Sequence, residues 1–289
     1  MKLWVLLPAF NEEASLPVLL PKIDEIFKKH LLDYKIVIVD DGSSDRTNDL
    51  LKSYSQTMPV EIITHEINRG LGETERDGFE YIAANSADED MIIRIDCDDT
   101  HEPMYFINMI DKIKEGYDVV VASRFQKGGG QKGVNAYRAL ISFSASLFMK
   151  IMFNIKGVRD YSCGYRIYRA SIIKNAIGIF GNQFIQLKGI GFTSTLETIV
   201  KLKLMGCRFG EVPFMLRYDQ KVSSSKMVSS ITTFGYFAMA VLYHWPFGGW
   251  RSAFKRLAAD LKENPEKAVT KYSKYRREQR NVVGRIGGG

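Results

Sequence analysis

Short apolar segments alternate with amphipathic segments along the first 125 residues of the chain. The apolar segments have the length and β-branched content of buried strands, and the amphipathic segments repeat with the period of a helix. Strands are predicted at 3–7, 36–39, 60–64, 91–95 and 119–122, with helices at about 14–30, 45–56, 72–87 and 103–115. This order predicts the α/β class, with a mostly parallel, Rossmann-like sheet flanked by helices.

Polar motifs follow three of the predicted strands at the point where each strand ends. The motifs are Pro8-Ala9-Phe10-Asn11-Glu12-Glu13, Asp40-Asp41-Gly42-Ser43-Ser44-Asp45 and Asp96-Cys97-Asp98. Because ligands of open α/β sheets bind outside the carboxyl ends of the strands, we expect these motifs to surround one pocket. A turn and a helix N-cap would explain the middle motif alone. Two acidic motifs at one edge of the sheet favour a binding site.

The acidic motif is a candidate metal site. Asp96, Asp98 and Asp99 lie within four residues, and their charges repel one another unless a cation is near. Carboxylate oxygens suit Mg²⁺ or Mn²⁺. The alternative is an acidic turn before a helix that begins at Pro103.

Two common nucleotide-binding patterns are absent from the sequence. No Gly-x-Gly-x-x-Gly follows the first predicted strand, and no Gly-x-x-x-x-Gly-Lys occurs in the chain. A glycine-rich motif follows the third strand instead, Asn68-Arg69-Gly70-Leu71-Gly72. It could place backbone N–H groups near a phosphate, or it could form a turn before a helix.

In their order and spacing, these motifs resemble those of the family 2 inverting glycosyltransferases, which have the GT-A fold. Within that family, the sequence is most similar to the polyprenyl-phosphate glycosyltransferases. The similarity covers residues 1–227 and includes Ser123-Arg124-Phe125, Asp160-Tyr161-Ser162-Cys163-Gly164-Tyr165-Arg166-Ile167-Tyr168, Gly210-Glu211-Val212-Pro213 and Ser225-Lys226-Met227. It implies a catalytic domain with a nucleotide-binding half at 1–125 and an acceptor half at 126–227.

The resemblance also implies a role for each motif. The implied donor-binding residues are Pro8, Ala9, Asn11, Glu12, Asp40, Asp41, Gly72, Asp96 and Arg124, and the implied metal ligands are Asp96 and Asp98. The candidate catalytic residues are Asp98, Arg124 and Glu197, and the candidates for binding the acceptor or a phosphate are Ser162, Arg166, Arg217, Lys221, Ser225 and Lys226. Mg²⁺ or Mn²⁺ would neutralise charge on the departing diphosphate, and Arg124 would add a bidentate contact. For Arg124, an ordinary ion pair is the alternative.

The sequence departs from the family pattern at two places. Thr100 stands where the polyprenyl-phosphate enzymes commonly have Gln, and Ser194-Thr195-Leu196-Glu197 replaces Phe-Gln-x-Glu. A lipid phosphate is already ionised near neutral pH, so its attack needs positioning rather than a base. A sugar hydroxyl would need a base, for which Glu197 is the first candidate and Asp160 the second. The alternative for Glu197 is an ion pair with Lys201, four residues further along a helix.

Two apolar segments and a basic segment suggest contact with a membrane. Residues 139–155 carry Lys150 as their single charge, and residues 228–250 contain no Asp, Glu, Lys or Arg. Because the second segment is rich in Ser, Thr and Gly, we expect C-terminal amphipathic helices in the headgroup region rather than a spanning helix. Residues 251–289 contain 11 Lys and Arg against 4 Asp and Glu, which predicts a basic tail attracted to anionic lipid. Core packing or a homodimer contact is the alternative for the apolar segments.

We therefore expect metal-dependent, inverting transfer of a sugar from a GDP- or UDP-sugar to a dolichyl- or undecaprenyl-type phosphate. The expected location is the cytoplasmic face of a membrane, or the cytoplasm, because Cys97, Cys163 and Cys207 form no disulfide or zinc spacing. No nucleic-acid partner is expected. The sequence is compatible with a homo-oligomer.

The sequence is compatible with three alternative functions. The first is transfer to a hydroxyl of a glycan or glycolipid. The second is a sugar nucleotidyltransferase, which should carry a glycine-rich basic loop where this chain has Asn11-Glu12-Glu13. The third is a non-catalytic scaffold that binds sugar nucleotides.

Overall fold

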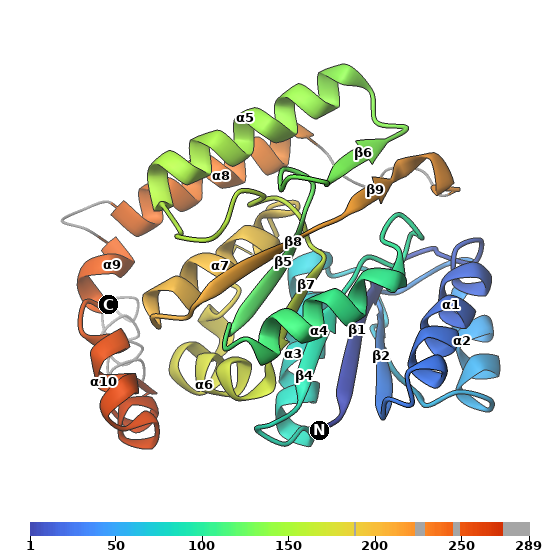
Figure 1. Cartoon of the computed structure of the whole chain (residues 1–289), viewed down its shortest axis with the longest axis horizontal. Helices are drawn as coiled ribbons and strands as arrows, with labels where there is room; N and C mark the ends of the chain where they lie inside the picture. Colours follow the sequence, from blue (N-terminus) through green and yellow to red (C-terminus); the bar gives the residue numbers. More distant parts are fainter. Residues whose placement is uncertain (188, 223–228, 245–248, 274–289) are drawn as a thin grey trace, which may run out of the picture.

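The centre of the protein is a seven-stranded sheet (Figure 1). This computed structural model describes residues 1–187, 189–222, 229–244 and 249–273. In spatial order the strands are β3 (Val60–Thr64), β2 (Tyr34–Asp40), β1 (Leu3–Ala9), β4 (Met91–Arg94), β7 (Arg166–Arg169), β5 (Val119–Ser123) and β8 (Phe209–Pro213). Neighbours run parallel except at β7, which is antiparallel to both β4 and β5. The predicted mostly parallel α/β sheet is confirmed.

Helices cover both faces of this sheet. The helices that connect the strands are α1 (Leu16–Lys29), α2 (Thr47–Ser55), α3 (Leu71–Asn85), α4 (Phe106–Lys114), α6 (Ala170–Phe180) and α7 (Thr193–Leu204). Side chains alternate along β1, so that Val5 and Leu7 pack with α1 and α4, whereas Trp4 and Leu6 pack with α3 and α6. Each face of the sheet therefore has its own apolar core. Short 3₁₀ helices occur at Pro103–Tyr105, Gly181–Gln183 and Tyr218–Gln220.

A second layer lies over the carboxyl edge of the sheet. It contains the two-stranded parallel ribbon of β6 (Gly130–Lys132) and β9 (Met215–Arg217), and the helices α5 (Ala136–Phe153) and α8 (Ser229–His244). The two helices lie side by side at the top of Figure 1, where the ring centroids of Phe148 and Phe237 are 5.2 Å apart. The apolar segments predicted to be amphipathic helices therefore form one helix pair.

The segment predicted to be a basic tail is folded against the domain as far as residue 273. It contains α9 (Gly249–Ala253) and α10 (Leu257–Glu263), which lie at the left of Figure 1. Phe254 packs on Phe180 of α6 with ring centroids 5.2 Å apart, and Leu257 and Tyr272 are buried. The expectation of a tail beginning at residue 251 is corrected accordingly, because these apolar side chains belong to the core. Residues 274–289 lie outside the described part of the chain.

The length and hydropathy of the helices decide whether any of them could span a membrane. Within the described residues, no helix combines the length and the apolar character needed to cross a bilayer.

Candidate active site

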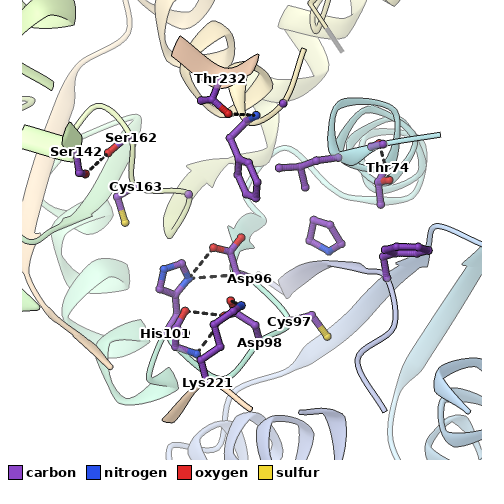
Figure 2. A pocket seen from close by; sticks show the side chains of 18 of the residues that line it. Thr74, Asp96, Cys97, Asp98, His101, Ser142, Ser162, Cys163, Lys221 and Thr232 are labelled. Atoms are coloured by element: carbon purple, nitrogen blue, oxygen red, sulfur yellow. Dashed lines mark hydrogen bonds and ion pairs between the residues drawn. The ribbon is translucent and has the colours of Figure 1, made fainter. Parts of the chain in front are cut away.

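A cavity of about 660 Å³ opens where the carboxyl ends of the strands meet the second layer (Figure 2). One part of its wall comes from the loops after β1 and β4 and from the loop that leads into α3. The opposite part comes from α5 and α8, which contribute Ile141, Ser142, Thr232 and Tyr236. The cavity therefore connects the polar strand ends with the apolar helix pair.

Asp98 is held in a tight turn at the cavity wall. The backbone turns through Asp99, which has a left-handed φ of 57°. Thr100 donates from its backbone N–H (3.2 Å) and from its hydroxyl (2.6 Å) to Oδ1 of Asp98. The other oxygen, Oδ2, contacts the ammonium of Lys221 (Figure 2). Thr100, which replaces the commoner Gln, thus orients this carboxylate through its hydroxyl.

Asp96 is oriented by a fully buried arginine behind the cavity wall. Arg94, the last residue of β4, contacts Oδ1 of Asp96 and donates from Nε to Glu75 of α3 at 2.7 Å. Gly164 leaves room for this guanidinium, because a Cβ at that position would lie 1.9 Å from Nη1. Burial raises the pKa of Asp96, but the charge and hydrogen bond of Arg94, together with the nearby charge of Lys221, outweigh burial and hold the pKa below its usual value. Asp96 is therefore ionised at neutral pH.

His101 completes the acidic loop. Its Nδ1 lies 3.3 Å from the backbone N–H of Asp96 and accepts from it, and its ring stacks on Tyr165 with centroids 5.1 Å apart. Burial lowers the pKa of His101, which favours the neutral ring that this acceptor role needs. Sequence reasoning missed His101, Arg94 and Glu75. Only the closeness of His101 to the acidic motif could have signalled a role.

The donor set at this loop fits a divalent cation that is shared with a ligand. Asp96 and Asp98 both line the cavity. Across the part of the chain that the structure describes, no three His, Cys, Asp or Glu side chains cluster as a complete metal cage. Mg²⁺ is commonly held by one or two carboxylates together with substrate phosphates and water. Two carboxylates at an open wall match that chemistry.

The motif after β1 is fastened to the motif after β2. Asn11 has a φ of 52° and accepts at Oδ1 from the backbone N–H of Ser44 at 2.8 Å. The backbone N–H of Glu12 donates to the hydroxyl of Thr47 at 2.8 Å. Pro8, Ala9 and Glu12 line the cavity, as predicted for a shared pocket, whereas Asn11 serves the link between the loops.

The two adjacent aspartates after β2 have different surroundings. Asp41 lines the cavity and accepts the backbone N–H groups of Arg69 and Gly70 at 2.8 Å each, while Nδ1 of His65 lies 2.7 Å away. Asp40 does not line the cavity and accepts from Ser43 and Asn48 within the turn. The turn role considered for this motif therefore fits Asp40, and the pocket role fits Asp41. Gly72 lies inside α3, while the preceding Asn68, Arg69, Gly70 and Leu71 reach the cavity.

Arg124 lies at the cavity wall in a bidentate ion pair. Its Nε and Nη2 each donate to the Asp160 carboxylate at 2.7 Å, and Nη2 also donates to the hydroxyl of Ser162 at 2.7 Å. The Ser162 hydroxyl is in turn 3.2 Å from that of Ser142 on α5 (Figure 2). Burial raises the pKa of Asp160, but Arg124 outweighs it and holds the pKa below the usual value. The structure thus gives Arg124 the ion pair named as its alternative, at a position that lines the cavity.

Several predicted site residues are not brought to the cavity. Glu197 is fully buried, pairs with Lys201 at 2.8 Å and accepts the backbone N–H groups of Gln186 and Leu187. The structure thus gives Glu197 the ion pair named as its alternative, and Glu197 is not among the described residues that line the cavity. Arg166 is also fully buried, with its guanidinium on the carbonyls of Tyr161 and Thr195.

The remaining candidates come from the segment after β8. Lys221 lines the cavity, together with Tyr218. Arg217 is not part of the wall and pairs with Asp219 at 2.9 Å. Ser225 and Lys226 lie outside the described residues.

The sequence matches a known family model. Residues 4–176 match the model described as glycosyl transferase family 2, and the chain belongs to that family. It is 31% identical to a dolichol-phosphate mannosyltransferase of Pyrococcus furiosus over an alignment of 215 residues. This alignment covers 74% of this chain and 56% of the relative. It is 27% identical to an undecaprenyl-phosphate mannosyltransferase of Micrococcus luteus over 232 residues, and this alignment covers 80% of this chain and 89% of the relative. The chain thus spans little more than half of the first relative.

The fold is also similar to that of solved glycosyltransferases. The glucosyl-3-phosphoglycerate synthase of Mycobacterium tuberculosis, solved with Mn²⁺, uridine diphosphate and phosphoglyceric acid, aligns with a TM-score of 0.56 at 16% identity. The alignment covers 83% of this chain and 77% of that one. The predicted GT-A fold is confirmed by this likeness.

Proposed function

We propose that the protein is a metal-dependent, inverting glycosyltransferase that moves a sugar from a nucleotide-sugar to a polyprenyl phosphate at a membrane surface. One observation carries this proposal. A single cavity is lined at one end by the strand-end carboxylates Asp96 and Asp98 and at the other by the apolar helices α5 and α8. The names of the relatives from Pyrococcus and Micrococcus support a polyprenyl-phosphate acceptor.

The donor would occupy the end of the cavity beside the sheet. The loops with Pro8, Asp41 and Gly70 would hold the nucleoside, and Asp96 and Asp98 would hold Mg²⁺ or Mn²⁺ against the diphosphate. A divalent cation there neutralises the charge that develops on the leaving diphosphate without a proton donor.

The ion pairing of the two candidate bases favours a phosphate acceptor. The two carboxylates considered as bases, Glu197 and Asp160, are both buried in ion pairs. A phosphate oxygen needs no deprotonation to attack the anomeric carbon from the face opposite the leaving diphosphate, and such a displacement inverts the configuration. Ser142 and Ser162 line the wall and can donate to a phosphate, with Arg124 adding positive charge.

The outer faces of α5 and α8 are suited to a membrane surface. Eight large apolar side chains there are exposed, from 46% for Ile231 to 72% for Ile151: Leu140, Phe143, Leu147 and Ile151 of α5, and Ile231, Phe234, Phe237 and Val241 of α8. Their spacing of three or four residues places them on one face of each helix. A contiguous apolar face of this kind marks an interaction surface, and a helix pair of this type can lie in the headgroup region.

The proposal is tested with a panel of UDP- and GDP-sugars and a polyprenyl phosphate in lipid vesicles, with Mn²⁺ or Mg²⁺. Mass spectrometry of the lipid fraction should reveal a glycosyl polyprenyl phosphate with one donor, and chelation of the metal should remove the product. Hydrolysis of the donor without a lipid product, or transfer only to a glycan hydroxyl, would contradict the proposed acceptor.

A further inference from the structure

Lys221 places its ammonium group against a candidate metal ligand from the cavity side. It contacts Oδ2 of Asp98, and the exposed fractions of the two side chains are only 9% and 16%. Glu12 and Asp96 also attract this charge. The oxygen that Lys221 contacts is the one that Thr100 leaves available, since both Thr100 hydrogen bonds go to Oδ1.

The other cations of the acidic loop approach from different directions. Arg94 reaches Asp96 from behind the wall and does not line the cavity. Lys22 of α1 pairs with Asp99 at 2.8 Å and with Glu102 at 3.4 Å, also outside the cavity. Among the described residues, Lys221 is therefore the cation that occupies the ligand side of Asp98.

The position of Lys221 in the chain connects the acidic loop with the apolar helix pair. Just before it, the backbone N–H of Arg217 in β9 donates to the carbonyl of Thr100 at 2.9 Å, which anchors the segment. Lys221 follows the 3₁₀ helix Tyr218–Gln220, and α8 begins at Ser229 soon after. A displacement of the Lys221 side chain would thus occur between the two ends of the cavity.

We propose that Lys221 is a built-in counter-ion for the metal site, which the divalent cation displaces and which then binds phosphate oxygens in the cavity. This inference rests on the proposed function. An ammonium group and a divalent cation cannot share Oδ2 of Asp98, because like charges at contact distance repel. Before the metal binds, Lys221 offsets the repulsion between Asp96 and Asp98. After it binds, the freed ammonium group lies beside the donor diphosphate, where it adds charge to the leaving-group end.

The first test follows the accessibility of single lysines. An amine-reactive reagent is applied to the full chain with EDTA, with Mn²⁺ alone, and with Mn²⁺ plus a nucleoside diphosphate, and labelling is quantified by mass spectrometry. Mn²⁺ alone should raise the labelling of Lys221 several-fold and leave Lys22 unchanged, and the nucleoside diphosphate should lower Lys221 labelling again. Equal labelling of Lys221 in EDTA and in Mn²⁺ would overturn the proposal.

The second test measures Mn²⁺ affinity by calorimetry without donor or acceptor. Lys221→Met keeps an unbranched side chain only one atom shorter and removes the competing charge, so it should tighten Mn²⁺ binding about tenfold. Lys22→Met is the matched control, because Lys22 carries the same charge and pairs with the same acidic loop but does not contact Asp98. Its effect should stay within about twofold. Equal gains in both variants would indicate general electrostatics and contradict the displacement, as would weaker binding to Lys221→Met.

The two proposals fail separately. Sugar transfer that depends on metal, together with unchanged Lys221 labelling, would leave the proposed function standing and reject the counter-ion role. Release of Lys221 by Mn²⁺ in a protein that transfers no sugar would support the counter-ion role and reject the proposed function.

Discussion

At the end of the cavity beside the sheet, carboxylates are fixed by several hydrogen bonds each, whereas the end between α5 and α8 offers hydroxyls and apolar side chains. Asp41 has three partners, Arg69, Gly70 and His65, and both oxygens of Asp98 are engaged. Ser142 and Ser162 share one contact, and Ile141 and Tyr236 complete that wall. The end beside the sheet therefore suits a polar ligand that is held in one geometry. The end between α5 and α8 suits a lipid, which needs apolar contacts but fewer fixed hydrogen bonds.

The largest expected effect comes from the metal ligand Asp98. Asp98→Ala should abolish transfer with the fold intact, because the loss of charge neutralisation costs several kcal/mol of transition-state stabilisation. The matched control is Asp99→Asn, since Asn tolerates the left-handed φ and Asp99 does not line the cavity. Initial rates and circular dichroism check both variants. Wild-type turnover by Asp98→Ala would remove the metal role.

The next effect separates the two aspartates after β2. Asp41→Asn should raise the donor KM about 10- to 100-fold with a smaller change in kcat, because it weakens charged hydrogen bonds that shape the donor loop. Asp40→Asn should change the donor KM less, since Asp40 lies off the cavity. Steady-state kinetics at saturating acceptor measure both constants. A larger KM change for Asp40→Asn would reverse the assignment of pocket and turn roles.

A third effect concerns the apolar end. Deletion of residues 228–289 would also remove Met239 and Tyr243 of α8, which are buried in the core. Point substitutions at exposed positions test the membrane contact without this loss of core packing. The double variant Phe143→Asp, Phe237→Asp should lower partitioning to anionic vesicles about 100-fold while sparing transfer to a short, soluble acceptor. Val18→Asp, on the exposed side of α1, is the control. Flotation assays report the partitioning, and unchanged flotation of the double variant would exclude this face as the membrane contact.

The smallest expected effect is the pH dependence of the bidentate Arg124–Asp160 ion pair at the acceptor end. Arg124 outweighs burial and holds the pKa of Asp160 below its usual value of 3.8. The pair therefore stabilises the fold fully above that value and loses its contribution as the pH falls toward the folded-state pKa. The difference in unfolding free energy between wild type and Asp160→Asn should be constant from about pH 5 to 7 and shrink below about pH 4. A difference that stays constant to about pH 3 would contradict the lowered pKa.

The sequence predicted the parallel half of the sheet because its strands and helices differ in hydrophobic period. It did not predict β7, whose four residues Arg166–Arg169 begin and end with charged side chains and reverse the direction of the sheet. The sequence also could not show which of Asp40 and Asp41 lines the cavity. Neighbouring residues at a strand end point in opposite directions, and the sequence does not reveal which direction faces the cavity.

Long-range partners explain the other differences. Glu75 and His65 reach the site from other elements, so no local motif marks them. The sequence motif makes Glu197 a candidate base because it contains a carboxylate. A motif gives no information on burial, however, and in the structure Lys201 neutralises this carboxylate inside α7. The acidic loop was found because three carboxylates within four residues need a nearby cation wherever the chain places them.

We propose that this cavity joins a nucleotide-sugar end to a lipid-phosphate end. The most direct measurement compares initial rates on a polyprenyl phosphate and on the matching polyprenol, in the same vesicles, with the same nucleotide-sugar and Mn²⁺. We expect transfer to the phosphate and none to the alcohol, because Glu197 and Asp160, the two carboxylates considered as bases, are both buried in ion pairs. Equal rates on the two lipids, or transfer to the alcohol alone, would contradict it.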